Sequence, residues 1–269
     1  MIGFVMPDTS TLMLLGVTTF LAGFVDSIAG GGGLLTVPAL LLAGFDPVTA
    51  IATNKVQGTL SIVSALYTYA RKGLVEWRAG LPMFLVAATF GATGAASVHL
   101  MSKTFLNAIV PIALGLVALY FGFARGVGDA DRKAVLSRLF FIALIVPPIA
   151  FYDGFFGPGG GSFYTMALVS LLGLGLTRTT AMAKVLNGGS NAGSLLLFTL
   201  AGSVLWPVGI GMAVCSMAGA QIGSRLAVGY GARLIRPLIV LVCVALVIRL
   251  LSDPANPVHI FLASIANLG

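Results

Sequence analysis

The segment from Asp26 to Pro38 reads DSIAGGGGLLTVP and places four consecutive glycines inside an apolar run. Each glycine in a helix interior is about 1 kcal/mol less favourable than alanine. Glycine also lets another group approach the backbone closely, because it has no side chain. The segment therefore predicts a helix that is interrupted where something has to come near the chain.

The composition predicts an all-α integral membrane protein. Of the 269 residues, 58% are hydrophobic and 9% are charged, and the mean hydropathy is +1.04. An ordinary soluble domain is about 25% charged. Apolar stretches of about 20 residues, the length that spans a hydrocarbon core, recur along the chain. We expect a multi-pass protein of the inner or plasma membrane, with the lipid bilayer as its surroundings.

Several functional classes are disfavoured by the sequence. The first apolar segment has no basic region before it, so we do not expect a cleaved signal peptide. The net charge of +7 comes from residues scattered between apolar stretches, which indicates membrane topology rather than nucleic-acid binding. Cys215 and Cys243 lie in apolar runs and are expected to fill the core. Without a catalytic His, Cys and Glu constellation or a Walker motif, we expect neither an enzyme nor a cofactor or metal.

An internal repeat organises the chain. The stretch DGFFGPGGGSFYTMAL at 153–168 matches residues 26–40 if Pro158 is an insertion, and residues 52–77 match 181–206 without gaps. Lys55/Lys184, Ser61/Ser190, Gly73/Gly202 and Trp77/Trp206 share the offset 184 − 55 = 129. We predict a first repeat at 8–124, a charged cytoplasmic linker at 125–138, a second repeat at 139–251 and a C-terminal tail at 252–269. Repeats of this size are typical of transporters.

Each repeat is predicted to contain a helix that ends at the glycines, a short piece and three longer helices. The short pieces run from Gly33 to about Phe45 and from Gly161 to about Leu174. At about 1.5 Å per residue, thirteen residues cross about two thirds of the hydrocarbon core, so each piece is a half-helix or a re-entrant segment.

The basic residues favour two repeats of inverted topology. If each repeat crosses the membrane an odd number of times, eleven basic residues share one face and Lys103 and Arg249 lie opposite; four plain spans per repeat divide the same residues 8 to 5. The positive-inside rule favours the first arrangement and places both termini outside. The eleven residues are Arg71, Lys72, Arg78, Arg125, Arg132, Lys133, Arg138, Arg178, Arg225, Arg233 and Arg236.

The two glycine clusters are candidate substrate-binding elements. Inversion would bring them together near the midplane, each before the N-terminus of a short helix. Such an N-terminus carries about +0.5 charge and backbone N–H groups that the helix leaves without partners, so it attracts anions. The alternative is that the glycines only permit tight helix crossing. The candidate residues are Gly31, Gly32, Gly33, Gly159, Gly160, Gly161 and Ser162.

Lys55 and Lys184 are further candidates for binding the anion. They are the only two of the fifteen Lys and Arg residues that fall neither in a loop nor near a helix end. Lys55 follows Asp46 by nine residues, about 13 Å along a helix and close to the midplane, where an ionisable group is a functional candidate by default. The alternative is that both lysines snorkel to an interface. Near them lie polar residues that can donate to an anion or join helices: Asn54, Gln57, Asn187, Ser190 and Asn191.

Asp26 and Asp153 are matching acids, each shortly before a glycine break. Three roles are open for them. They can pair with the lysines, hold backbone amides of the broken segment as structural caps, or carry protons for coupled transport.

The chain resembles the sulfite exporter TauE/SafE family, also called the sulfonate uptake permease family. The resemblance rests on FVDSIAGGGGLLTVPALLLAGFDPVTAIATNK and its second copy FYDGFFGPGGGSFYTMALVSLLGLGLTRTTAMAKVLN. It implies transport of a small sulfur-containing anion such as sulfite, thiosulfate or sulfoacetate, and no catalytic or coupling residue is carried over from it.

We therefore predict a secondary transporter that works by alternating access, with proton coupling as an open possibility. The alternatives are a passive anion channel and a transporter of a non-sulfur organic anion. The identity of the anion, the direction of transport, the coupling stoichiometry and the choice between monomer and homodimer stay open.

Overall fold

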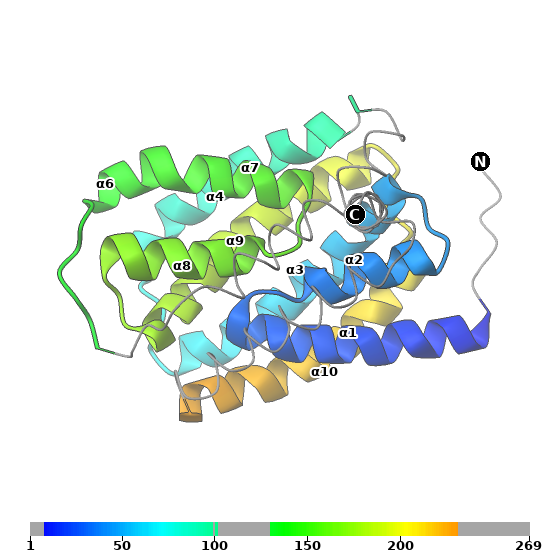
Figure 1. The fold of residues 1–269 in the computed structure, drawn as a ribbon, viewed down its shortest axis with the longest axis horizontal. Helices are drawn as coiled ribbons and strands as arrows, with labels where there is room; N and C mark the ends of the chain where they lie inside the picture. Colours follow the sequence, from blue (N-terminus) through cyan, green and yellow to red (C-terminus); the bar gives the residue numbers. More distant parts are fainter. Residues whose placement is uncertain (1–7, 99, 102–129, 231–269) are drawn as a thin grey trace, which may run out of the picture.

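The computed structural model describes residues 8–98, 100–101 and 130–230 (Figure 1). Within these ranges all regular structure is helical. The last helix expected in each repeat, at 102–124 and 231–251, lies outside the described residues. So do residues 125–129 of the linker, the tail at 252–269, and Cys243.

The first half of the chain forms four described helices. They are α1 (Thr9–Ala29), α2 (Gly33–Leu42), α3 (Pro47–Arg71) and α4 (Trp77–Val98). Local signals begin two of them: the Asp8 carboxylate accepts from the N–H of Thr11 at 3.3 Å, and the Asp46 carboxylate accepts from Thr49 at 3.3 Å. These N-caps satisfy donors that the first helical turn leaves free.

The second half repeats this order. It contains α6 (Arg138–Phe140), the π-helical segment η1 (Phe141–Ile145), α7 (Val146–Phe155), α8 (Gly160–Leu172), α9 (Leu176–Leu200) and α10 (Trp206–Tyr230). The first three elements form one continuous apolar helix, Arg138–Phe155. Pro147 and Pro148 lack the N–H groups that α-helical bonding requires, which accounts for the wider π turns just before them.

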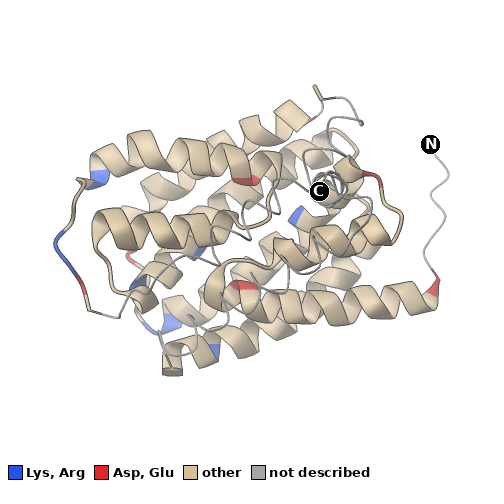
Figure 2. Cartoon of the chain, in the orientation of Figure 1, with Lys and Arg blue, Asp and Glu red and all other residues tan. Residues whose placement is uncertain are grey.

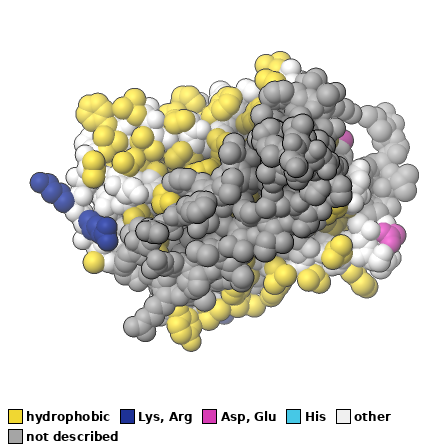
Figure 3. All heavy atoms as spheres, in the orientation of Figure 1, with side chains coloured by type: hydrophobic (Ala, Val, Ile, Leu, Met, Phe, Trp, Pro, Cys, Tyr) yellow, Lys and Arg dark blue, Asp and Glu magenta, His cyan; other side chains and the backbone are white. Residues whose placement is uncertain are grey.

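Helix lengths agree with a membrane protein. Three helices are long and apolar enough to cross a bilayer: Thr9–Ala29, Trp77–Val98 and Arg138–Phe155. Helices α3, α9 and α10 have 25 residues each and are also long enough. The short apolar helices expected after the glycine clusters are present as α2 and α8. On the face shown in Figure 3, hydrophobic side chains gather along the two long edges of the molecule, and most of the visible charged side chains lie toward its two ends.

The two halves are intertwined. Helix α4 of the first half packs on α7 and α9, and α10 of the second half packs on α1 and α3, while α3 and α9 contact each other at the centre. Helices α2 and α8 run in opposite directions, as do α1 and α7 (Figure 1). We call α1, α2, α3 and α10 the first bundle, and α7, α8, α9 and α4 the second bundle.

Glycines allow the close helix crossings within each bundle. A Cβ on Gly94 of α4 would lie 2.1 Å from the carbonyl oxygen of Phe151 on α7. The equivalent contact joins Gly223 of α10 and the carbonyl oxygen of Phe24 on α1, where the distance would be 2.4 Å. Gly94 and Gly223 are separated by the repeat offset of 129. Phe24 and Phe151 are separated by 127, the offset that also relates Asp26 to Asp153. The same crossing therefore occurs in both repeats.

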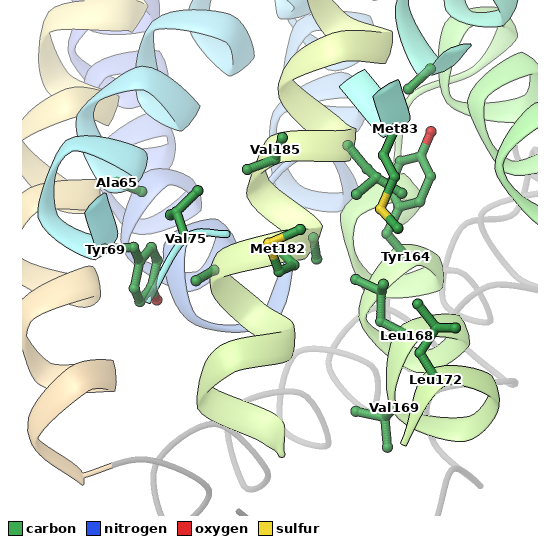
Figure 4. Packing of buried hydrophobic residues seen from close by; sticks show 14 of the residues in the cluster. Ala65, Tyr69, Val75, Met83, Tyr164, Leu168, Val169, Leu172, Met182 and Val185 are labelled. Carbon is green, nitrogen blue, oxygen red and sulfur yellow. The ribbon is translucent and has the colours of Figure 1, made fainter. Parts of the chain in front are cut away.

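A buried hydrophobic cluster lies among helices α3, α8 and α9. Tyr69 of α3, Met182 and Val185 of α9, and Tyr164 and Leu168 of α8 belong to it (Figure 4). The Tyr69 hydroxyl donates to the carbonyl oxygen of Ser27 at 2.7 Å, which links α3 to the end of α1. This packing positions α3, α8 and α9 around the glycine breaks.

Lys and Arg residues outside the core gather toward one end of the molecule (Figure 2). Arg178 pairs with Glu76 and with Asp131 (2.7 Å), and Arg138 pairs with Glu76 at 2.9 Å. Arg71, Lys72 and Arg225 surround one surface hollow. Of the eleven basic residues expected on one membrane face, those that the structure describes lie toward this end. Arg125, Arg233 and Arg236 of that set lie outside the described residues, as do Lys103 and Arg249, which are expected on the opposite face.

Candidate functional site

The first glycine cluster makes a sharp break that Asp26 holds in place. Helix α1 ends at Ala29, and Gly30 has φ 80, a left-handed conformation that favours glycine. The N–H of Gly30 donates to the backbone oxygen of Asp26 at 2.8 Å, and the N–H of Gly32 donates to its carboxylate at 3.1 Å. A Cβ on Gly32 would lie 2.7 Å from the Cβ of Asp26. The aspartate thus caps the break, and glycine is required beside it.

The second cluster makes the matching break before α8. Gly157 (φ 96) and Gly159 (φ 84) have left-handed conformations, and α8 begins at Gly160. A Cβ on Gly160 would lie 2.6 Å from the Cγ of Asp153. The extra residue of this cluster, Pro158, accepts a hydrogen bond from the Tyr152 hydroxyl at 2.7 Å.

The two breaks touch each other. The N–H of Ser162 donates to the backbone oxygen of Gly30 at 3.1 Å, and the Ser162 hydroxyl donates to that of Ala29 at 2.5 Å. A Cβ on Gly161 would lie 2.9 Å from the Cα of Gly30. The starts of α2 and α8 are therefore neighbours, although more than 120 residues of chain separate them.

Each buried lysine pairs with the aspartate of the other half. The Nζ atom of Lys55 on α3 lies 3.1 Å from the Asp153 carboxylate and also donates to the backbone oxygen of Asp153. The Nζ atom of Lys184 on α9 lies 2.7 Å from the Asp26 carboxylate and donates to the Asp26 backbone oxygen. The lysine side chains are 0% and 1% exposed. Both ion pairs connect the first bundle to the second.

A small cavity lies between the breaks. Its volume is about 30 Å³, enough for a few water molecules at most. Helices α1, α3, α7 and α9 and both glycine breaks contribute to its wall. The lining residues are Asp26, Gly30, Gly33, Asn54, Gln57, Gly58, Ser61, Ile62, Asp153, Gly157, Gly161, Asn187 and Asn191.

Two amide groups point toward the starts of the short helices. The Nδ2 atom of Asn54 is 3.5 Å from the place of a Cβ on Gly33, and that of Asn187 is 2.7 Å from the place of a Cβ on Gly161. The oxygens of both amides are occupied: Asn54 accepts from Thr36 and from Gln57 (3.2 Å), and Asn187 accepts from Asn191 at 2.7 Å. Their NH₂ groups are thus left to face the glycines, and each helix start has an amide donor beside it.

Two buried oxygens in the cavity wall have no partner among the described residues: the Oε1 of Gln57 and the Oγ of Ser61. Gln57 is 3% exposed and Ser61 is 2% exposed. Burying a polar group without a hydrogen bond is unfavourable by about 1–3 kcal/mol. The cavity wall therefore contains two polar groups that are available to bond to a polar molecule, water included.

The structure divides the candidate residues into a lining group and a supporting group. Gly33, Asn54, Gln57, Gly161, Asn187 and Asn191 line the cavity with both aspartates. Gly31, Gly32, Lys55, Gly159, Gly160, Ser162, Lys184 and Ser190 lie behind it. Ser190, for example, donates to the Asp153 carboxylate. Among the described residues no cluster of His, Cys, Asp and Glu could hold a metal ion.

Sequence reasoning missed five lining residues: Gly30, Gly58, Ser61, Ile62 and Gly157. A signal for two of them was present. Gly58 and Ser61 follow Asn54 at helical positions i+4 and i+7, and so share one face of α3. Ser61 is also the repeat partner of the candidate Ser190.

A helical membrane protein with a polar cavity between two interrupted helices has the construction of a membrane transporter. The sulfite exporter TauE/SafE family model matches residues 15–250. The chain is similar to three proteins named as probable membrane transporters. ORF9 from Sinorhizobium sp. is 46% identical over 93% of this chain and 96% of its own length. YfcA from Escherichia coli K12 is 43% identical over 90% of this chain and 91% of its own length, and a protein from Haemophilus influenzae is 40% identical over 90% and 95%.

The chain belongs to the TauE/SafE family and is a membrane transporter. This confirms the resemblance inferred from the two glycine-containing segments. No solved structure matches the chain.

Proposed function

We propose that this protein is a secondary transporter that moves a small sulfur-containing anion, such as sulfite, thiosulfate or sulfoacetate, across the cytoplasmic membrane by alternating access. The observation that carries the proposal is the pair of helix starts, α2 and α8, that meet at one buried cavity with an amide donor beside each. The family membership supports a sulfur-containing substrate, and the geometry of the cavity supports an anionic one.

The donors in the cavity wall suit an oxyanion. The first turn of a helix presents free N–H groups and a partial positive charge. Here the positive ends of α2 and α8, the NH₂ groups of Asn54 and Asn187, and the Ser61 hydroxyl meet at one small space. Several N–H groups of these helix starts, such as those of Leu34 and Ser162, already donate to backbone oxygens, so the amide side chains are the main free donors. Half-helix N-termini that point at anionic groups near the membrane midplane are a recurring transporter arrangement.

The lysines contribute indirectly in this proposal. Each lysine is balanced by an aspartate at hydrogen-bonding distance, so the four buried charges sum to zero, and neither lysine lines the cavity. While all four groups are charged, oriented dipoles attract the anion, and the ion pairs hold the two bundles against each other.

We propose inverted-topology repeats as the basis of the transport cycle. The opposite directions of α2 and α8, the duplicated glycine crossings and the exchanged lysine–aspartate pairs all support a twofold relation between the halves. The units that rock are the two intertwined bundles rather than the two halves of the sequence. Gly73 and Gly202, both with left-handed φ, lie where the chain passes from one bundle to the other.

The cavity must widen during this cycle. A volume of about 30 Å³ admits water but is small for an organic sulfonate, so the present arrangement corresponds to a closed site. Separation of the bundles along the α3–α9 contact would enlarge it.

The proposed orientation puts the basic end in the cytoplasm and both termini outside. It rests on the gathering of Arg71, Arg138, Arg178 and Arg225 at one end of the molecule. Import of an anion against an interior-negative potential is unfavourable by about 2.3 kcal/mol per charge at 100 mV, so import requires a coupled cation, whereas export does not.

A thermal-shift screen of the purified protein tests the proposal. Sulfite, thiosulfate and sulfoacetate are compared with sulfate, taurine and carboxylates, because a ligand that binds the folded state raises its melting temperature. We expect stabilisation by at least one of the three sulfur anions, and loss of this effect in Asn187→Ala. Thr89→Ala is the control, because Thr89 is exposed on α4 and bonds only within its own helix. Stabilisation by carboxylates alone would refute the sulfur assignment, and an unchanged response in Asn187→Ala would refute the site.

A further inference from the structure

The two aspartates occupy matching positions but have different surroundings. Asp153 is held on every side: its carboxylate accepts from Lys55 at 3.1 Å, from the Nδ2 of Asn191 at 3.0 Å, and from the Ser190 hydroxyl. Its side chain is 2% exposed. Three donors stabilise the charged form of this carboxylate and occupy both of its oxygens.

Asp26 is more open. Its carboxylate accepts from Lys184 at 2.7 Å and from the N–H of Gly32 at 3.1 Å, and its side chain is 13% exposed. Ser61 is the repeat counterpart of Ser190, yet its hydroxyl has no partner among the described residues, whereas Ser190 donates to Asp153. Asp153 thus receives a hydrogen bond from the serine of its own half, whereas Asp26 receives none from Ser61.

The cavity wall offers acceptors that a protonated Asp26 could use. The Oε1 of Gln57 and the Oγ of Ser61 are buried without partners and line the same cavity as Asp26. An ionised carboxylate only accepts hydrogen bonds, whereas a protonated one has an O–H donor. A proton on Asp26 therefore adds one O–H donor to the wall of the cavity that both oxygens line.

We propose that Asp26 binds the proton that is co-transported with the anion, and that Asp153 is a fixed structural charge. The inference rests on the proposed anion transport. Protonation cancels the negative charge of Asp26 and leaves the ammonium of Lys184 without its balancing partner, beside the starts of α2 and α8. The site then carries one net positive charge and attracts the anion, so proton and anion bind together.

Protonation also weakens a contact between the bundles, since Asp26 belongs to α1 and Lys184 to α9. The other titratable groups near Asp26 are Tyr69 of α3 and Asp153 of α7. Helix α10 packs on α1, but its one charged residue, Arg225, lies in the basic hollow with Arg71 and Lys72. Helices α2 and α8 carry no charged residue. Lys184 is thus the charge that responds directly to the proton.

Anion binding as a function of pH tests the inference, with thiosulfate and sulfoacetate as probes because neither takes up a proton near neutral pH. For wild-type protein we expect the affinity to rise as the pH is lowered, by up to about tenfold per pH unit, since one proton is linked to one anion. In weakly buffered solution with a pH indicator, about one proton should be taken up per anion bound.

Asp26→Asn mimics the protonated state. We expect this variant to bind the probe without pH dependence or proton uptake. In proteoliposomes it should exchange anion across the membrane but fail to accumulate it in response to a pH gradient. Asp153→Asn is the matched comparison and should keep the pH dependence of binding, at lower stability. If Asp26→Asn does not fold, Asp26→Glu serves instead and should shift the pH at which binding changes.

The possible failures are distinguishable. Probe binding to wild-type protein without proton uptake would overturn the inference and leave the proposed function standing. Loss of the pH dependence in Asp153→Asn but not in Asp26→Asn would overturn the assignment to Asp26. If neither probe binds to wild-type protein, the proposed function fails and the inference fails with it.

Discussion

The buried pair of Lys55 and Asp153 allows a quantitative prediction about stability. The variant Lys55→Met keeps a long apolar side chain but removes the ammonium, which is 0% exposed and 3.1 Å from the Asp153 carboxylate. Removal of one partner of a buried ion pair destabilises a protein by about 3–5 kcal/mol, because the other charge is left uncompensated. For a chain of this size each kcal/mol lowers the melting temperature by roughly 2–4 °C, so we expect a decrease of about 6–20 °C.

A double-mutant cycle in purified protein measures this interaction. Asp153→Asn keeps a polar group opposite Ser190 and Asn191, and the variant that carries both changes has no uncompensated charge. Its loss of stability should be smaller than the sum of the two single losses by about 0.5–3 kcal/mol. Lys72→Met is the control, since Lys72 is exposed at the end of α3, and it should change stability by no more than about 0.5 kcal/mol. Additive losses, or a Lys55→Met variant as stable as Lys72→Met, would refute the reasoning.

Three further predictions address the site, the charged end and the topology. Gly161→Ala adds a Cβ only 2.7 Å from the Nδ2 of Asn187 and should abolish anion-induced stabilisation, with a loss of about 1–3 kcal/mol by thermal melting. The control Gly211→Ala, inside α10, meets nothing within 4 Å and should keep stability or raise it by up to about 1 kcal/mol. Glu76→Gln removes two exposed ion pairs and should lower the melting temperature slightly at low salt and not at high salt. An equal decrease at low and at high salt would contradict an electrostatic role for these pairs. Val135→Cys, in a protein without other cysteines, should react with an impermeant thiol reagent only after the cells are permeabilised, and labelling of intact cells would reverse the proposed orientation.

The glycine breaks and buried lysines could be predicted from the sequence because each leaves a local signal. Four glycines in an apolar run oppose helix formation, and a lysine nine residues into an apolar helix cannot reach water easily. The repeat then doubled both signals. The short helices α2 and α8 follow from the same pattern, since each apolar run after the glycines is too brief to span the bilayer.

The partners of these residues could not be predicted in the same way. Asp26, Asp153, Lys55 and Lys184 were all candidates, but the exchange that pairs each lysine with the aspartate of the other half depends on how the bundles assemble. Periodicity describes one helix at a time and says nothing about which helix lies opposite.

The packing of α4 on the second half and of α10 on the first half could not be predicted for a related reason. The contact of α4 with α7 depends on glycines that meet backbone carbonyl oxygens, such as Gly94 and Phe151. A glycine in a membrane helix signals a close approach, but it does not identify the neighbour. Hydropathy predicted the order of the helices that the structure describes, while shape complementarity decides their partners.

The exchanged ion pairs have a consequence for how the protein is made. The partner of Lys55, Asp153, is synthesised 98 residues later, and the partner of Asp26, Lys184, is synthesised 158 residues later. At a synthesis rate of about 5–20 residues per second, these intervals last about 5–20 s and about 8–32 s. During that time the first half holds a lysine and an aspartate destined for the membrane interior without their final partners. Both charges therefore reach their final pairing only after the second half has been synthesised.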